Sequence, residues 1–177
     1  LSAKTKDGLI TLANHLQHSV LIDLQEAYVA LFDRNPLLSL HLFEHVHGDS
    51  KDRGQAMVDL KNLYNEKNLT MTARELPDYL PLFLEYLSLL PVAETKKLVA
   101  QPINIIGILG ARLKAKDSLY SVIFLALEEI SPIKPEHEEI SKALAIKEKD
   151  TAIAIDDAWQ EKPAFAANNV NCQTCQG

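Results

Sequence analysis

Apolar residues recur at intervals of three and four along nearly the whole chain, and this period constrains the fold more than any other feature. At 3.6 residues per turn, such positions share one face of an α-helix. Leu9, Leu12 and Leu16 begin the pattern, and Leu60 and Tyr64 show it again. Runs with a period of two, rich in valine, threonine and aromatics, are hard to find. The sequence therefore predicts an all-α, single-domain multi-helix bundle.

Prolines, glycines and capping residues divide this pattern into separate helices. We expect helices over residues 9–16, 24–32, 37–46, 51–64, 76–90, 93–100, 103–115, 118–130, 135–146 and 151–159. Asp23 should cap the second helix, and Gly48 should end the third. Gly107 and Gly110 should let a neighbouring helix approach closely. We predict a helical domain over residues 1–161 and a flexible polar tail over residues 162–177.

Composition excludes several classes of function. The 177 residues suffice for one core, and the net charge of −6 argues against a sequence-independent nucleic-acid binder, which needs a basic excess. No apolar stretch reaches the length of a membrane span, so we expect no direct membrane insertion. Two cysteines, Cys172 and Cys175, form no disulfide framework and suggest a reducing, cytoplasmic compartment. No phosphate-binding glycine loop, dinucleotide fingerprint or serine nucleophile elbow is present.

Histidines gather in residues 39–48, most of which fall in the predicted helix over residues 37–46. There His41, Glu44 and His45 would share one face. Polar groups on a buried helix are costly unless paired, so these three form an internal network or line a site. The same residues match the H-x-x-E-H pattern of zinc peptidases, which makes a metal-binding protein or metal-dependent hydrolase the alternative function. That alternative needs a third ligand that the sequence does not mark.

Arg53 follows this cluster. Its guanidinium can pair with a nearby carboxylate, either Asp49 or Glu44. An exposed pair of this kind contributes little to stability. The sharper interpretation is that Arg53 fixes the loop that carries His47.

Three acidic residues are interspersed among apolar residues in residues 75–87. On a helix, Asp78, Pro81 and Glu85 would lie on one side, with apolar side chains over the remainder. Such an acidic stripe beside an apolar surface could receive an amphipathic, arginine-bearing peptide. An ordinary core helix with one hydrated edge explains the same pattern.

Four longer stretches carry a resemblance to a known family. Residues 28–34 (YVALFDR), 39–48 (SLHLFEHVHG), 52–60 (DRGQAMVDL) and 74–87 (RELPDYLPLFLEYL) strongly resemble the nitrate reductase delta subunit family. Residues 106–127 resemble it more weakly. The resemblance implies the all-helical fold of redox-enzyme maturation chaperones. It implies binding of the N-terminal segment of the nitrate reductase catalytic subunit, a remnant of a twin-arginine signal, while the molybdenum cofactor is inserted and before the enzyme docks at the membrane.

The sequence thus predicts a chaperone rather than an enzyme, with no cofactor of its own, acting as a monomer or weak dimer. Its expected partner is the N-terminal peptide of the nitrate reductase catalytic (alpha) subunit. The predicted peptide-binding residues are His41, Glu44, His45, His47, Arg53, Asp78, Tyr79, Leu82, Phe83, Glu85 and Tyr86.

Overall fold

The computed structural model describes residues 1–45, 51–67, 69, 71 and 75–146. Within these residues the chain is all-α, as predicted, and forms no strand beyond one isolated bridge between His41 and Tyr79. The helices are α1 (Ala3–His18), α2 (Leu21–Tyr28), α3 (Lys51–Glu66), α4 (Leu80–Ser88), α5 (Val92–Ala100), α6 (Ile103–Ala115), α7 (Ser121–Ile130) and α8 (His137–Ala145). None of the helices in these ranges is long and apolar enough to cross a membrane.

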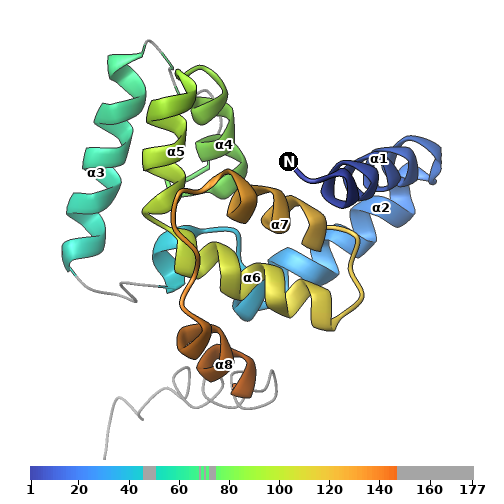
Figure 1. The fold of residues 1–177 in the computed structure, drawn as a ribbon. Coiled ribbons are helices and arrows are strands. Elements are labelled where there is room, and N and C mark those ends of the chain that lie inside the picture. The colour runs from blue at the N-terminus through green and yellow to red at the C-terminus, as the bar shows by residue number, and fades with distance from the viewer. Residues whose placement is uncertain (46–50, 68, 70, 72–74, 147–177) are drawn as a thin grey trace, which may run out of the picture.

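The centre of the molecule is α6, which packs against both α7 and α8 (Figure 1). Ile106, Leu109 and Leu113 are buried along one face of α6, as their spacing predicts. A Cβ atom on Gly110 would lie 2.8 Å from the Cβ of Phe124, so only glycine permits this approach of α7. The prediction that the glycines of this helix allow a close neighbour is confirmed.

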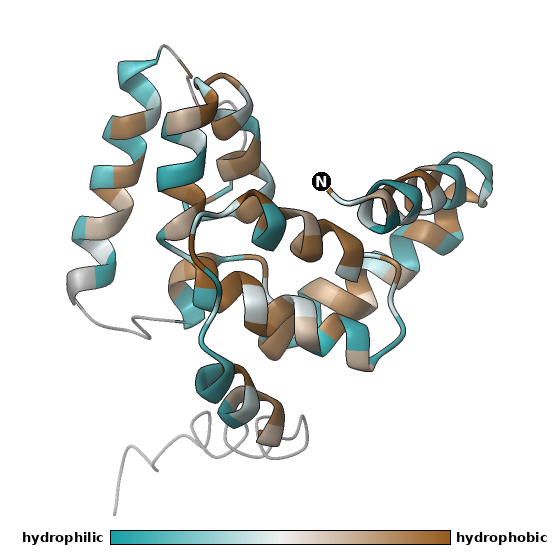
Figure 2. Ribbon diagram, in the orientation of Figure 1, coloured by the Kyte–Doolittle hydropathy of each residue, from teal (hydrophilic) through white to brown (hydrophobic). Residues whose placement is uncertain are grey.

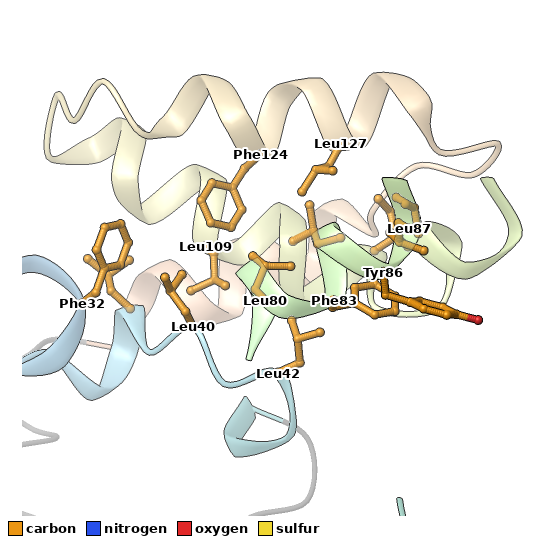
Figure 3. Close-up of a cluster of buried hydrophobic side chains, with 14 of the residues drawn as sticks. Phe32, Leu40, Leu42, Leu80, Phe83, Tyr86, Leu87, Leu109, Phe124 and Leu127 are labelled. Carbon is orange, nitrogen blue, oxygen red and sulfur yellow. The ribbon is translucent and has the colours of Figure 1, made fainter. Parts of the chain in front are cut away.

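One apolar cluster joins the central helices to the segment before α3. Leu109 of α6, Phe124 and Leu127 of α7, and Leu80 of α4 converge in it, and Leu40 reaches it from the segment between α2 and α3 (Figure 3). Apolar residues dominate α6 and α7, whereas polar residues cover much of α3 (Figure 2). The core therefore sits between α4, α6 and α7, with α3 at its edge.

Polar contacts to α7 help to attach the N-terminal helix. The carboxylate of Glu129 on α7 accepts hydrogen bonds from the Ser2 backbone N–H (2.6 Å), the Ser2 hydroxyl (2.8 Å) and the Thr5 hydroxyl. These bonds hold the pKa of Glu129 far below its usual value near 4.5, at about 2. Leu12 is buried, but Leu16, which the period places in the core, remains 39% exposed. The apolar stripe of α1 is thus only partly buried.

Several predicted helices have ends that differ by a few residues from the structure, and two of the predictions need a larger correction. The helix expected over residues 24–32 begins earlier, at Leu21, with Val20 rather than Asp23 at its cap, and ends in a π-helical turn over Val29–Asp33. The helix expected over residues 37–46 is wrong: two short 3₁₀ turns, Pro36–Leu38 and Leu42–His45, flank an extended residue instead. Tertiary hydrogen bonds to residues 78–80 overrode the local helical period there. The predicted helix over residues 151–159, the tail, Gly48 and the cysteine pair lie outside the described residues.

Candidate functional site

The site begins where residues 40–42 cross residues 78–80. The Leu42 N–H donates to the Asp78 carbonyl at 3.0 Å, and the Leu80 N–H donates to the Leu40 carbonyl at 2.8 Å. These bonds form the isolated antiparallel bridge between His41 and Tyr79. They satisfy backbone groups that would otherwise be buried without partners. The crossing therefore fixes the positions of the His41 and Tyr79 side chains.

A fully buried carboxylate, Asp78, stabilises this crossing. Its Oδ2 accepts the Phe43 N–H at 3.0 Å, and its Oδ1 lies 3.3 Å from the His41 Nδ1. A buried charge without partners is strongly unfavourable, and both oxygens here have one. Asp78 therefore holds the 3₁₀ turn of residues 42–45 against the start of α4.

His45 belongs to a different set of contacts. Its Nε2 lies 2.9 Å from the Ser39 carbonyl oxygen, which can only accept, so this nitrogen carries a hydrogen. Burial lowers the pKa of His45, and the nearby Arg112 guanidinium lowers it further. The imidazole is therefore neutral near pH 7 and acts as a structural donor.

A pocket of about 240 Å³ opens beside the crossing. We name it the Tyr28–Tyr79 pocket, and it is lined by Tyr28, Phe32, Asp33, Leu40, His41 and Tyr79. The hydroxyl oxygens of Tyr28 and Tyr79 are 2.8 Å apart, and Asp33 is solvent-exposed. Burial, the hydrogen bond to Tyr79 and nearby negative charge raise the pKa of Tyr28, so its hydroxyl stays protonated. The pocket combines aromatic walls, two tyrosine hydroxyls and one carboxylate.

The predicted face of His41, Glu44 and His45 does not form. His41 reaches Asp78, His45 reaches Ser39, and Glu44 lies 3.7 Å from the Arg53 guanidinium. The expected pairing of Arg53 with Glu44 is thus confirmed, whereas His47 and Asp49 lie outside the described residues. No group of histidines, cysteines and carboxylates that could hold a metal ion occurs in the described part of the chain. The geometry gives the H-x-x-E-H interpretation no support.

The prediction that Asp78, Pro81 and Glu85 form one acidic stripe on a helix is also wrong. Asp78 precedes α4 and is 0% exposed, while Glu85 lies on α4 and is exposed. Pro81 falls in the first helical turn, where its missing N–H costs no hydrogen bond. The helix therefore starts two residues too late to align the two carboxylates.

The other residues predicted to contact a peptide differ in how deeply they are buried. Phe83 and Tyr86 are buried in the core, where the rings of Tyr86 and Tyr64 pack with centroids 4.9 Å apart. Leu82 is partly buried against the same cluster. Of the predicted residues, His41 and Tyr79 line the pocket directly. Tyr28, Phe32, Asp33 and Leu40 were not predicted as site residues, although the first three lie in the family-like run 28–34.

A second pocket, of about 430 Å³, lies between α1, α6, α7 and α8. Its walls are mostly small or aliphatic, and include Gly8, Gly107, Val122 and Leu125. Burial raises the pKa of Glu128 at its edge, although Lys134 and Lys114 oppose that shift. This pocket offers apolar surface but few convergent polar groups.

Comparison with known proteins decides the family. The family model for the nitrate reductase delta subunit matches residues 1–124, which include the Tyr28–Tyr79 pocket. The chain belongs to the nitrate reductase delta subunit family. The expectation drawn from the four family-like stretches is thereby confirmed.

Three related proteins illustrate the similarity. The nitrate reductase molybdenum cofactor assembly chaperone NarJ of Escherichia coli K12 is 42% identical over 142 residues, which cover 80% of this chain and 60% of that protein. The probable assembly chaperone NarW of the same strain is 40% identical over 155 residues, 87% of this chain and 67% of that protein. The probable NarJ of Bacillus subtilis is 32% identical over 109 residues, 59% of each. The chain thus spans about three fifths of the length of the first relative.

Proposed function

We propose that this chain is an assembly chaperone of a respiratory nitrate reductase and is not itself an enzyme. It binds the N-terminal segment of the catalytic subunit in the cytoplasm while the molybdenum cofactor is inserted, before the enzyme docks at the membrane. The observation that carries this proposal is the family match over residues 1–124, together with relatives named as molybdenum cofactor assembly chaperones.

Two features of the structure support a binding role. The Tyr28–Tyr79 pocket reaches solvent through Asp33. The neighbouring polar groups are hydrogen-bonded within the protein, so its walls are already in place before a ligand arrives. His41 and Tyr79 then serve as contact residues, whereas Asp78, Phe83 and Tyr86 support the walls from within the core.

The remaining predicted contacts lie nearer the surface. Glu44 and Glu85 are exposed, and Arg53 and Leu82 are partly exposed. We place them at the periphery of the bound segment, where charges set orientation and association rate more than affinity.

Isothermal titration calorimetry tests the proposal. The ligand is a synthetic peptide with the N-terminal sequence of the nitrate reductase catalytic subunit from the same genome. We expect saturable binding with one peptide per chain and a dissociation constant of roughly micromolar or tighter, about −8 kcal/mol. A peptide of the same composition in scrambled order is the control. Absence of binding by the native peptide, or equal binding of both, would overturn the proposal.

A further inference from the structure

We propose that the Tyr28–Tyr79 pocket is a subsite for the guanidinium group of a single arginine side chain. This proposal rests on the proposed function in one respect: the arginine would belong to the bound N-terminal segment of the catalytic subunit. The assignment itself rests on the charge, the aromatic walls and the size of the pocket.

The charge of the pocket favours a cation. Asp33 is its one carboxylate, and neither lysine nor arginine is among its lining residues. No ion pair joins Asp33 to a cation in the described ranges. The carboxylate also lies near enough to the Tyr28 hydroxyl to contribute to the raised pKa of that group. Asp33 is therefore available to an incoming positive charge.

The aromatic walls select a flat cation. The rings of Tyr28 and Phe32 pack with centroids 4.9 Å apart, and those of His41 and Tyr79 with centroids 5.4 Å apart. The face of an aromatic ring attracts a cation, and the planar guanidinium stacks on it. A compact ammonium is more strongly hydrated and lacks that planar contact. The walls thus favour arginine over lysine.

The tyrosine hydroxyls add acceptors beside this surface. One hydroxyl donates to the other across 2.8 Å, which leaves lone pairs on both oxygens. A guanidinium carries five N–H donors in a fixed plane, so it can bond the Asp33 carboxylate and a hydroxyl oxygen together. The bridge between His41 and Tyr79 fixes the backbone of two wall residues.

The size of the pocket excludes larger ligands. Pockets that bury drug-sized ligands measure roughly 300–1,000 Å³, more than the 240 Å³ available here. An anion would find no lysine or arginine among the lining residues. A metal ion would need several convergent ligands, and Asp33 is the single carboxylate present. One long cationic side chain is the occupant that fits both volume and charge.

Nuclear magnetic resonance titration of the ¹⁵N-labelled full chain tests the subsite. The probe is N-acetyl-arginine N-methylamide, and the matched neutral probe is the citrulline analogue, which has nearly the same shape. We expect saturable chemical-shift changes at the amides of residues 28–33, 41 and 79 with the arginine probe. The citrulline probe should bind at least about fivefold more weakly. Equal binding of both probes, or shift changes confined to other residues, would overturn the subsite.

A pair of variants isolates the carboxylate. Asp33→Asn removes the charge at the pocket, and Glu26→Gln removes an exposed charge from α2 outside the pocket lining. We expect Asp33→Asn to weaken arginine-probe binding about fivefold or more and Glu26→Gln to change it less than twofold. Equal effects of the two variants would show that net charge alone attracts the probe, which contradicts the subsite.

The two proposals fail in different ways. If the arginine probe binds at the pocket but the peptide of the catalytic subunit does not bind, the subsite holds and the proposed function fails. If the peptide binds with unchanged affinity to the Asp33→Asn variant and the arginine probe does not bind, the proposed function holds and the subsite fails.

Discussion

The contact between α6 and α7 and the crossing of residues 40–42 over residues 78–80 share one apolar cluster, but the crossing adds a buried carboxylate and backbone hydrogen bonds. Leu109 and Phe124 join the helices through apolar surface, and Gly110 allows close approach. The crossing also buries Leu40, Leu42 and Leu80, and it is held in addition by the Asp78 carboxylate and by backbone hydrogen bonds. The difference teaches that apolar burial builds the scaffold of this protein, whereas a buried polar network shapes its candidate site.

The largest effect should follow from a cavity in the apolar contact. Leu109→Ala removes a side chain that is 0% exposed at the centre of the cluster. We expect a loss of about 3 kcal/mol in the free energy of unfolding, within the range of roughly 2–5 kcal/mol for such cavities. Urea denaturation measures it. Leu125→Ala on α7, where the side chain is 39% exposed, is the control and should cost less than about half as much. Equal losses of stability in the two variants would contradict the position of Leu109 in the core.

Removal of the buried carboxylate should have the next largest effect. Asp78→Ala leaves the Phe43 N–H and the His41 ring without their acceptor in the protein interior. We expect a loss of about 2 kcal/mol, because an unsatisfied buried donor costs roughly 1–3 kcal/mol. Denaturant unfolding again measures it, with Glu85→Gln at an exposed position as a control expected to change stability by less than about 0.5 kcal/mol.

The same substitution sharpens the comparison between the two regions. Amide signals of residues 40–43 should shift strongly in Asp78→Ala, whereas those of residues 106–113 should change little. A fully stable variant with an unchanged crossing would contradict the role assigned to Asp78.

Two glycines offer a matched pair of substitutions with opposite expected signs. A Cβ at Gly110 would meet Phe124, so Gly110→Ala should lose about 1–2 kcal/mol through overpacking. A Cβ at Gly54 in α3 would meet nothing within 4 Å, so Gly54→Ala should gain nearly 1 kcal/mol from helix propensity. Thermal unfolding reports both signs. A stabilising Gly110→Ala would show that α6 and α7 are not in such close contact.

These contrasts explain how far the sequence predicts the structure. The period of Ile106, Leu109 and Leu113 is local information, so α6 was predicted with its correct bounds. The partners of Asp78 are 35 and 37 residues away in the chain, and no local spacing reveals them. Residues 37–46 do have a helical period, but the hydrogen bonds to these distant residues outweigh it, so no α-helix forms there. Asp33 escaped prediction as a site residue because its pocket exists only once Tyr79 lies beside Tyr28.

The smallest predicted effect concerns the polar attachment of α1 and depends on pH. The pKa of Glu129 falls from about 4.5 to about 2 on folding because Thr5 and Ser2 donate to it. Between these values the unfolded chain binds more protons, so this contribution to stability is present above about pH 4.5 and is lost as the pH falls toward 2. The free energy of unfolding of the Glu129→Gln variant should therefore change less with pH in that window than that of the wild type. Identical pH profiles for the wild type and Glu129→Gln would contradict the attachment.

We propose that the chain assists molybdenum cofactor insertion into nitrate reductase. The most direct test of this proposal is to produce the chain in a bacterial strain that lacks its own nitrate reductase assembly chaperone, and to measure the molybdenum content of the purified reductase. We predict that the chain raises the molybdenum content and nitrate reduction well above those of the strain without it. An unchanged molybdenum content, with the chain present at normal levels and bound to the catalytic subunit, would contradict the account.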